Sequence, residues 1–288
     1  MGNRNVIVYS LLIIGVVFLV KCTGNPFWDD DIDSSDQLTV TGNVEVNDGS
    51  VPEDIYVWLE GLNVSASTNS NGAFTLDLPA PQLQPGGGLT GSLKLYFYLG
   101  NYEYKTAVLY VTKGYLEYGQ GDLDDEGYVK KQIILEKLLD IETTVIPTTV
   151  QQFDSLAFIQ IILTVRNLAT TVYIETIQGS TGTLIGYMFK KADGPLTEAI
   201  LNPSSRDPVM NLINRETTFT GGARAFDLGL IAEPAQYEVF PYIRVIQAGL
   251  PEALITSIDE NAHQYHAGYL NIPYRQDTGT LTCVPISN

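Results

Sequence analysis

The chain has 288 residues, of which 44% are hydrophobic, so it can bury the core of one large domain or of two ordinary ones. Its 33 acidic and 16 basic residues give a formal net charge of −17. Because so acidic a surface repels phosphate groups, the charge argues against nucleic-acid binding and against peripheral electrostatic docking on anionic lipid.

The N-terminus predicts export and attachment to a membrane. Arg4 precedes an apolar run from Val6 to Val20. A run of about 15 residues fits the hydrophobic part of a signal peptide, whereas a membrane-spanning helix needs about 20. Leu19-Val20-Lys21-Cys22 resembles a bacterial lipoprotein box, although the charged Lys21 stands where a small residue is usual. We therefore expect a signal peptide over residues 1–21 and lipidation of Cys22. An uncleaved signal anchor, with Cys22 an incidental thiol, is the alternative.

The segment that follows, residues 22–37, predicts an acidic tether. Residues 27–36 are mostly acidic or polar and lack apolar periodicity. Like charges extend such a linker, so it should hold the folded part away from an anionic membrane.

Residues 38–139 predict a first β-sandwich. Apolar and polar residues alternate over 38–46, 55–60, 64–68 and 73–79, and Asn/Gly-rich turns separate these segments. Pro85-Gly86-Gly87-Gly88 marks a flexible loop. Further strands are expected over 93–99, 106–112 and 128–138. Short strands at this spacing are typical of an antiparallel sandwich.

This first region resembles the carboxypeptidase regulatory-like family. The resemblance depends on Gly42-Asn43-Val44, on the strand from Ile55 to Leu59, and on the turn and strand from Thr68 to Pro79. Asn69 and Asn71 stand where that family more often has acidic residues. The resemblance implies a transthyretin-like β-sandwich, whose usual roles are structural or adhesive.

Residues 140–288 predict a second, Ig-like sandwich. Candidate strands cover 141–145, 158–168, 170–174, 182–189, 234–245 and 268–272. The β-branched run that ends in Arg166-Asn167-Leu168, with a strand after it, resembles adjacent strands of Ig-like domains. Residues 194–215 are expected to form a long loop or a short helix. A fainter likeness to the bacterial intracellular proteinase inhibitor type carries no residue over.

One predicted loop carries four carboxylates, which makes calcium the candidate cofactor. These residues are Asp122, Asp124, Asp125 and Glu126. Ca²⁺ takes several oxygen ligands, so such a loop could bind it. The spacing does not fit an EF-hand, and a solvated acidic turn is the alternative.

Tyrosines are dense between residues 96 and 128. Since alternate residues of a strand face outward, Tyr96, Tyr98, Tyr102 and Tyr104 are candidates for a protein or glycan contact surface. Simple β-propensity with cross-strand pairing is the alternative.

No catalytic residue is predicted. His263 and His266 would share one face of a helix and could ligate a transition metal there, but the surrounding residues favour a loop. The sequence has no Gly-x-Ser-x-Gly motif, although paired carboxylates for glycoside cleavage need no linear motif. If Cys22 is acylated, Cys283 has no partner within the chain; a Cys22–Cys283 disulfide is the alternative.

Together these patterns predict an all-β protein of two tandem antiparallel β-sandwich domains behind a signal peptide and a tether. The favoured function is a non-catalytic, lipid-anchored structural, adhesion or accessory-assembly subunit of the bacterial cell envelope, at the outer membrane or cell surface. Its partner would be another protein or further copies of itself, and not nucleic acid. A solute- or glycan-binding lipoprotein is the second hypothesis, and a protease inhibitor built on the second domain is the third.

Overall fold

The computed structural model describes residues 38–168, 171–202 and 206–286. The predicted signal peptide, Cys22 and the tether lie outside the described residues. Within the described ranges, none of the helices has the length and apolar character needed to cross a membrane.

The first half of the protein, residues 38–138, consists of two sheets. Their strand orders are β4-β1-β9-β6 and β3-β2-β5-β7-β8. Two short 3-10 turns, η2 (Pro81–Leu83) and η3 (Pro85–Gly87), follow β4. The strands are β1 (Thr39–Val46), β2 (Tyr56–Leu59), β3 (Val64–Ser67), β4 (Ala73–Asp77), β5 (Gly91–Tyr98), β6 (Tyr102–Glu103), β7 (Lys105–Thr112), β8 (Tyr115–Leu116) and β9 (Ile133–Lys137).

The core of the first half lies between these two sheets. Val40 and Val44 of β1 pack in one buried cluster with Leu95 and Phe97 of β5. Each pair occupies positions of one parity in its strand, so the buried side chains point to one face of the sheet, as the period-two pattern predicts.

Strand β1 changes partner along its length. Thr39–Asn43 pair antiparallel with β4, and Val44–Val46 pair parallel with β9. This parallel pair differs from the antiparallel pairing expected throughout. A parallel pair needs a long crossover connection, and the chain between β1 and β9 contains the whole opposite sheet.

The second half, residues 139–286, has three sheets. Their orders are β10-β12-β17, β11-β20-β18-β14-β15 and β16-β13-β19, and β11 pairs with β20 in parallel. The elements are β10 (Leu139–Ile146), β11 (Thr149–Gln151), β12 (Phe158–Asn167), β13 (Val172–Thr176), β14 (Tyr187–Lys191), η4 (Leu196–Glu198), β15 (Ile200–Leu201), β16 (Val209–Ile213), β17 (Thr217–Arg224), β18 (Ala235–Pro241), β19 (Ile243–Ile246), α2 (Glu252–Ile258), η5 (Ala267–Asn271) and β20 (Gly279–Val284).

The predicted all-β class is confirmed. In the described part of the chain, strands dominate both halves, and the α-helix α2 is only seven residues long. Two local expectations are wrong. Residues 268–272 lie mostly in the 3-10 helix η5, which begins where Gly268 N–H donates to His266 Nδ1 (3.1 Å). The stretch 194–215 contains strand β16, whose side chains do not alternate between buried and exposed and so give no strand pattern.

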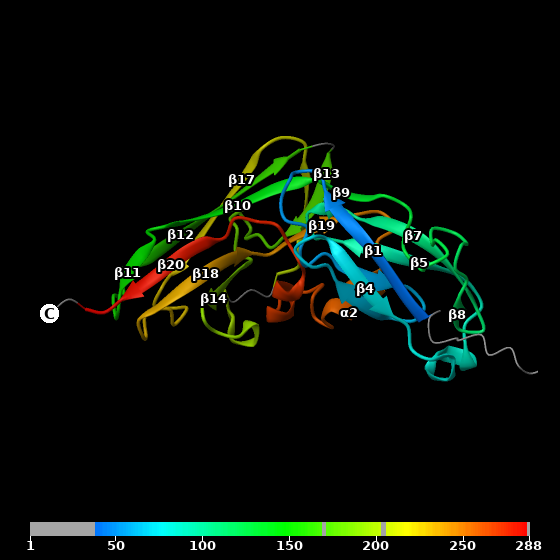
Figure 1. Ribbon diagram of the computed structural model, residues 1–288. Coiled ribbons are helices and arrows are strands. Elements are labelled where there is room, and N and C mark those ends of the chain that lie inside the picture. Colours follow the sequence, from blue (N-terminus) through cyan, green and yellow to red (C-terminus); the bar gives the residue numbers. More distant parts are fainter. Residues whose placement is uncertain (1–37, 169–170, 203–205, 287–288) are drawn as a thin grey trace, which may run out of the picture.

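Three clusters of buried side chains organise the molecule. One contains residues from Val40 to Leu135 and a second contains residues from Leu139 to Cys283. A third, here named the joint cluster, combines side chains of both halves, which lie side by side in Figure 1. Its buried members are Trp58, Tyr96, Tyr98, Ile177, Met188, Tyr242, Leu254, Ile255, Ala262, Tyr269 and Ile272. The predicted domain boundary near Leu139 stays a prediction, because the joint cluster links the two halves.

Candidate functional site: the junction and the distal tip

The joint cluster covers the outer face of β2 and β5. In the register of these strands Trp58 lies opposite Tyr96, and Tyr56 lies opposite Tyr98. These four rings point away from the core of the first half, because residues of the other parity, such as Phe97, fill that core. Residues of α2 and η5 pack over them, and the Tyr56 hydroxyl lies 3.0 Å from Ser257 Oγ of α2.

The tyrosines singled out by the sequence are therefore mostly internal. Tyr96, Tyr98 and Tyr102 are buried, which makes the expectation of an exposed contact surface wrong for these three. Tyr104 is partly buried, and its hydroxyl donates to Ala248 O (3.0 Å) of the second half. The outward orientation of Tyr96 and Tyr98 is as expected, but the surface that meets them belongs to the same chain.

A buried amide fixes the junction. Asn101 is fully buried, and its Nδ2 donates to Leu139 O (2.9 Å) and to Arg275 O (2.7 Å). Its Oδ1 accepts a hydrogen bond from Arg275 N–H (3.0 Å). Gly100 N–H donates to Pro273 O (2.7 Å) just beside it. The turn between β5 and β6 thus binds the backbone of residues 273–275 directly.

A second amide, that of Gln247, binds the backbone of β6 and of the residue that follows it. Gln247 Nε2 donates to Tyr102 O (2.9 Å), and Gln247 Oε1 accepts from Tyr104 N–H (3.0 Å). Two bonds from one planar side chain fix direction as well as distance. Both amides hold the halves in one arrangement, so any cleft between them is already formed in the free protein.

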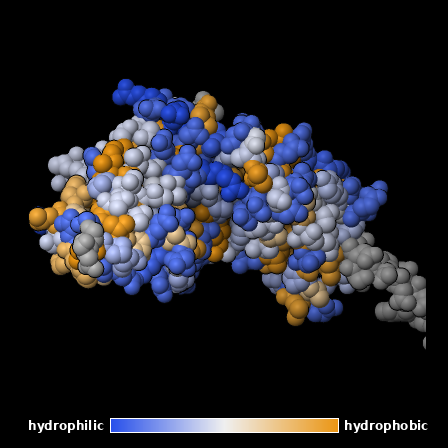
Figure 2. All heavy atoms as spheres, turned by 60° about the vertical axis from the view of Figure 1, so that its left-hand side comes forward, coloured by the Kyte–Doolittle hydropathy of each residue, from blue (hydrophilic) through white to orange (hydrophobic). Residues whose placement is uncertain are grey.

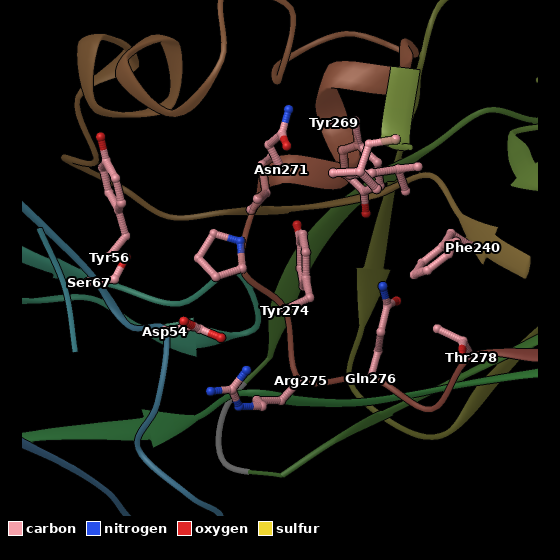
Figure 3. Close-up of a pocket in the computed structure, with 14 residues that line it drawn as sticks. Asp54, Tyr56, Ser67, Phe240, Tyr269, Asn271, Tyr274, Arg275, Gln276 and Thr278 are labelled. Atoms are coloured by element: carbon pink, nitrogen blue, oxygen red, sulfur yellow. The ribbon is translucent and has the colours of Figure 1, made fainter. Parts of the chain in front are cut away.

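Such a cleft opens at the junction (Figure 3), and we name it the junction cleft. Its volume is about 460 Å³, within the range of 300–1,000 Å³ that is usual for small-molecule sites. Asp54 and Tyr56 of the first half lie on one side, Phe240 and Thr278 of the second half lie on the other, and Tyr274 lies between them (Figure 3). The cleft therefore needs both halves.

Among the described residues that line the junction cleft, Gln276 has a buried side-chain oxygen without a hydrogen-bond partner. The Arg275 guanidinium donates to the backbone oxygens of Val51 (3.5 Å) and Glu53. Gln276 Oε1 is buried and has no donor among the described residues. Since buried acceptors are nearly always paired, this oxygen favours a ligand that brings a hydroxyl or N–H group.

Burial keeps the phenols at the junction protonated. It raises the pKa of Tyr274 well above the usual value, and the nearby Tyr269 phenol opposes its ionisation further. Tyr269 has a raised pKa for the same main reason, burial. The Tyr274 and Tyr269 hydroxyls both donate to Ile243 O (2.8 Å each), so they serve as fixed neutral donors near the cleft.

A neighbouring hollow of about 360 Å³ contains a firmly ionised carboxylate. Burial would raise the pKa of Asp48, but hydrogen bonds from Tyr102 and Ser50, together with the Lys137 ammonium, outweigh it and lower the pKa to about 2. Tyr102 Oη lies 2.7 Å from Asp48 Oδ2, and Lys137 Nζ lies 3.3 Å from it. Asp48 is therefore a charged structural acceptor at neutral pH.

The carboxylates of the predicted calcium loop hold its turns. Asp122 Oδ2 accepts from Val108 N–H (2.7 Å). Asp124 Oδ1 accepts from the N–H groups of Glu126 (3.0 Å) and Tyr128 (2.7 Å). Across the described residues, no group of three or more His, Cys, Asp or Glu side chains is placed to hold a metal ion. Calcium binding by Asp122, Asp124, Asp125 and Glu126 stays a prediction.

The histidines and Cys283 lie apart from the cleft. His263 and His266 lie in the turns between α2 and η5, which is the loop setting expected for them. Cys283 is buried in β20, and burial raises the pKa of its thiol. Cys22 lies outside the described residues, so its lipidation stays a prediction, as does its alternative pairing with Cys283.

The far end of the second half carries an exposed apolar group that the sequence reasoning missed. We name it the distal tip. Its members and their exposed fractions are Phe153 (63%), Leu156 (79%), Phe158 (57%) and Phe226 (60%). The loop before β12 and the loop after β17 form it together, because Ala225 N–H donates to Ala157 O (2.9 Å). Figure 2 shows apolar surface gathered at this end of the molecule.

No protein-family model matches the chain, and no curated protein matches its sequence. Among solved structures, the chain is similar to a type II cohesin–X-dockerin complex from Acetivibrio cellulolyticus, with 18% identity and a TM-score of 0.23 over 35% of this chain and 58% of that one. It is similar to a DUF3823 family protein from Parabacteroides merdae, with 9% identity and a TM-score of 0.29 over 72% of this chain and 90% of that one. It is also similar to the shaft pilin spaA from Lactobacillus rhamnosus GG, with 10% identity and a TM-score of 0.24 over 87% of this chain and 98% of that one. Scores this low carry no function to this chain, and the carboxypeptidase regulatory-like resemblance stays a prediction.

Proposed function

We propose that this protein is a non-catalytic structural, adhesion or accessory-assembly subunit of the cell envelope, which binds a protein partner through the distal tip. The observation that carries the proposal is the gathering of four large apolar side chains, each more than half exposed, at one end of the molecule. Soluble proteins rarely expose a contiguous apolar patch unless it serves a contact.

The position of the distal tip suits this role. Figure 1 shows the start of β1 towards one end of the molecule and β11, next to the tip, at the opposite end. If Cys22 carries the expected lipid, the chain approaches the folded part at β1. The distal tip then faces away from the membrane, where a partner can reach it.

The distal tip also includes a strained residue. Phe153 has a φ of +61°, a left-handed backbone conformation that costs a side-chain-bearing residue roughly 1–2 kcal/mol. Its N–H donates to Ile231 O (3.2 Å), which holds the loop in place. Phe153 keeps this conformation although 63% of its side chain is exposed, which favours a role in contact with a partner.

The charges beside the distal tip select the partner. Asp154 and Asp227 lie next to the apolar residues and are exposed, and Arg224 is the nearby cation. A second copy that met the chain tip to tip would set these carboxylates against their own counterparts. With a net charge of −17 on the chain, we expect a partner whose apolar recess has a neutral or basic rim. Three phenylalanine rings of 150–250 Å² each at roughly 60% exposure, together with the Leu156 side chain, supply on the order of 400–500 Å², about half of one side of a standard interface.

Photo-cross-linking tests the distal tip. A photoreactive amino acid at Leu156, in the full chain in cells, is expected to give one discrete cross-linked product. Leu83, in η2 of the first half, is the matched control position because its exposed fraction of 78% nearly equals the 79% of Leu156.

The variant Phe153→Gly distinguishes a loss of contact with the partner from a loss of folding stability. Relief of the strained φ should leave the free energy of unfolding unchanged or raise it by up to about 1 kcal/mol. The cross-link at Leu156 should nevertheless fall several-fold. Equal products at Leu156 and Leu83, or a cross-link that Phe153→Gly does not change, would contradict the proposal.

Binding of a hydroxyl-bearing solute such as a glycan in the junction cleft is a second candidate function. The unpaired Gln276 Oε1 favours it. Neutral oligosaccharides at millimolar concentration are expected to raise the melting temperature of the native chain but not that of Gln276→Leu. Gln120→Leu, a change at an exposed glutamine of the first half, is the control that should keep the shift. Absence of a shift in the native chain across neutral and acidic oligosaccharides would remove this candidate.

A further inference from the structure

A hollow of about 310 Å³ lies along β19, and we name it the β19 hollow. Tyr98 of β5 lines it from the first half, and Arg244, Glu252 and His263 line it from the second. It shares only Ile272 with the junction cleft, so it is a separate site. Its volume falls at the lower end of the range that small-molecule sites occupy.

The walls of the β19 hollow are largely apolar. Val245, Ile255 and Ile272 are buried side chains that line it. Ile246 and Leu250, which are partly buried, line it as well. Because apolar surface is stabilised when it leaves water, these walls favour a ligand with an apolar body.

His263 contributes a buried N–H donor to the β19 hollow. Gln264 Nε2 lies 3.1 Å from His263 Nε2. Because an amide nitrogen can only donate, the ring Nε2 is the acceptor, and the neutral ring carries its proton on Nδ1. This Nδ1 is buried and has no hydrogen-bond partner among the described residues. Since buried donors are nearly always paired, the N–H group favours a ligand that brings an acceptor oxygen.

Arg244 adds a positive charge in a fixed position. Its Nε and Nη2 both meet Glu175 Oε2, at 2.9 Å and 2.6 Å, and Nη1 takes no part in this pair. The Arg244 side chain is 35% exposed, so a ligand can still reach it. Burial raises the pKa of Tyr98 well above its usual value and the Tyr274 phenol adds to this, whereas the nearby Arg244 cation partly offsets it. Tyr98 is therefore a neutral hydroxyl close to the guanidinium.

We propose that the β19 hollow binds a small apolar molecule that carries one carboxylate. The carboxylate accepts from His263 Nδ1 and from Arg244 Nη1, while the apolar body packs against Val245, Leu250 and Ile255. A carboxylate suits these donors better than a neutral carbonyl, because hydrogen bonds between charged groups are about twice as strong as neutral ones. An amine does not suit them, since both groups are donors.

Glu252 limits the charge of the ligand. It lies exposed at the start of α2 and lines the β19 hollow. Solvent and salt screen an exposed carboxylate, so it does not prevent a single negative charge from reaching Arg244. A second negative charge on the ligand would have no cation of its own in the hollow. We therefore expect a monocarboxylic acid to bind and a dicarboxylic acid of the same length to bind more weakly.

Nuclear magnetic resonance of the histidine rings tests this site in the full chain. The chain has only two histidines, so their ring nitrogen signals are readily distinguished. Octanoate is the probe, with half-saturation expected below about 1 mM. It should shift the ring signals of His263 and leave those of His266 unchanged. His266 lies outside the hollow, and its Nδ1 already accepts from Gly268 N–H (3.1 Å).

Matched ligands isolate the contribution of the carboxylate. Octanamide keeps the apolar chain but removes the charge, and octylamine reverses the charge. Octanoate is expected to bind about tenfold more tightly than octanamide, and octylamine should not shift the His263 signals. Octanoate and N-acetylleucine offer the proposed chemistry as a lipid acid and as a peptide C-terminus. Binding of either supports the site, and the tighter of the two identifies the source.

Two variants test the walls and the donor separately. His263→Leu should raise the dissociation constant of octanoate about tenfold in calorimetry, because it removes a hydrogen bond to a charged group. Leu250→Trp should abolish binding, because the larger ring fills the hollow. Leu83→Trp, at an exposed position of the first half, is the matched control and should bind octanoate like the native chain. Unchanged His266 signals in Leu250→Trp verify that it has folded.

Three results would overturn this site. The first is an absence of any shift at His263 up to about 10 mM octanoate and N-acetylleucine. The second is octanamide or octylamine that binds as tightly as octanoate. The third is octanoate binding that a folded Leu250→Trp leaves unchanged. None of these readouts involves the distal tip, so the site and the proposed function can fail independently.

Discussion

Replacement of Asn101 with alanine is expected to lower the free energy of unfolding by about 3–5 kcal/mol. The change removes three hydrogen bonds and leaves Leu139 O, Arg275 O and Arg275 N–H without a partner at the junction. Each buried polar group left unpaired costs about 1–3 kcal/mol. Urea unfolding followed by circular dichroism measures the loss.

Asn71→Ala is the matched control for Asn101→Ala. Asn71 lies exposed in the turn before β4, and its own backbone N–H, which alanine keeps, donates to Asn69 Oδ1 (2.9 Å). This variant should stay within about 0.5 kcal/mol of the native chain. A loss below about 1 kcal/mol for Asn101→Ala would mean that the junction does not depend on this amide.

Removal of the Trp58 ring should have an effect of similar size. Trp58 is 3% exposed, its ring centroid lies 5.6 Å from that of Tyr96, and its Nε1 donates to Asn63 Oδ1 (2.8 Å). Truncation of a buried tryptophan to alanine typically costs about 3–5 kcal/mol through lost burial and a cavity. We expect Trp58→Ala to lower the free energy of unfolding by this amount in urea titrations.

Tyr110→Ala controls for aromatic truncation on the same face of the same sheet. Tyr110 lies on β7 beyond the reach of the joint cluster and is 40% exposed. Its removal should cost no more than about 1.5 kcal/mol, because the ring is only partly withdrawn from water. Equal losses for Trp58→Ala and Tyr110→Ala would show that the second half adds nothing to the stability of this face.

Much of the fold could be predicted because local alternation is strong in most strands. Val40 and Val44, or Leu95 and Phe97, recur at one parity and identify the buried face without any knowledge of the partner sheet. The parallel pair β1–β9 could not be found in this way, since its crossover is most of the first half. Residues 268–272 looked like a strand, but the structure places them mostly in a 3-10 helix against the joint cluster.

The candidate sites were harder to predict, since they depend on contacts between distant segments. The sequence shows that Tyr96 and Tyr98 share one face of a strand, but it does not show that α2 and η5 cover this face. The distal tip combines loops some 70 residues apart, around Phe153 and Phe226.

The pairing of β1 has a consequence for how the molecule carries mechanical load. Thr39–Asn43 pair with β4 on one side, and Thr41 also exchanges backbone bonds with Gly127 (3.0 Å) and Val129 (2.8 Å) on the other. In Figure 1 β1 begins towards the end of the molecule opposite β11 and runs obliquely to the line between the two ends, so a pull between these ends has a component along the strand. That component loads the backbone hydrogen bonds on both sides of β1 at the same time, and does not break them one after another. The first strand of the described chain is thus held on both sides against such a pull.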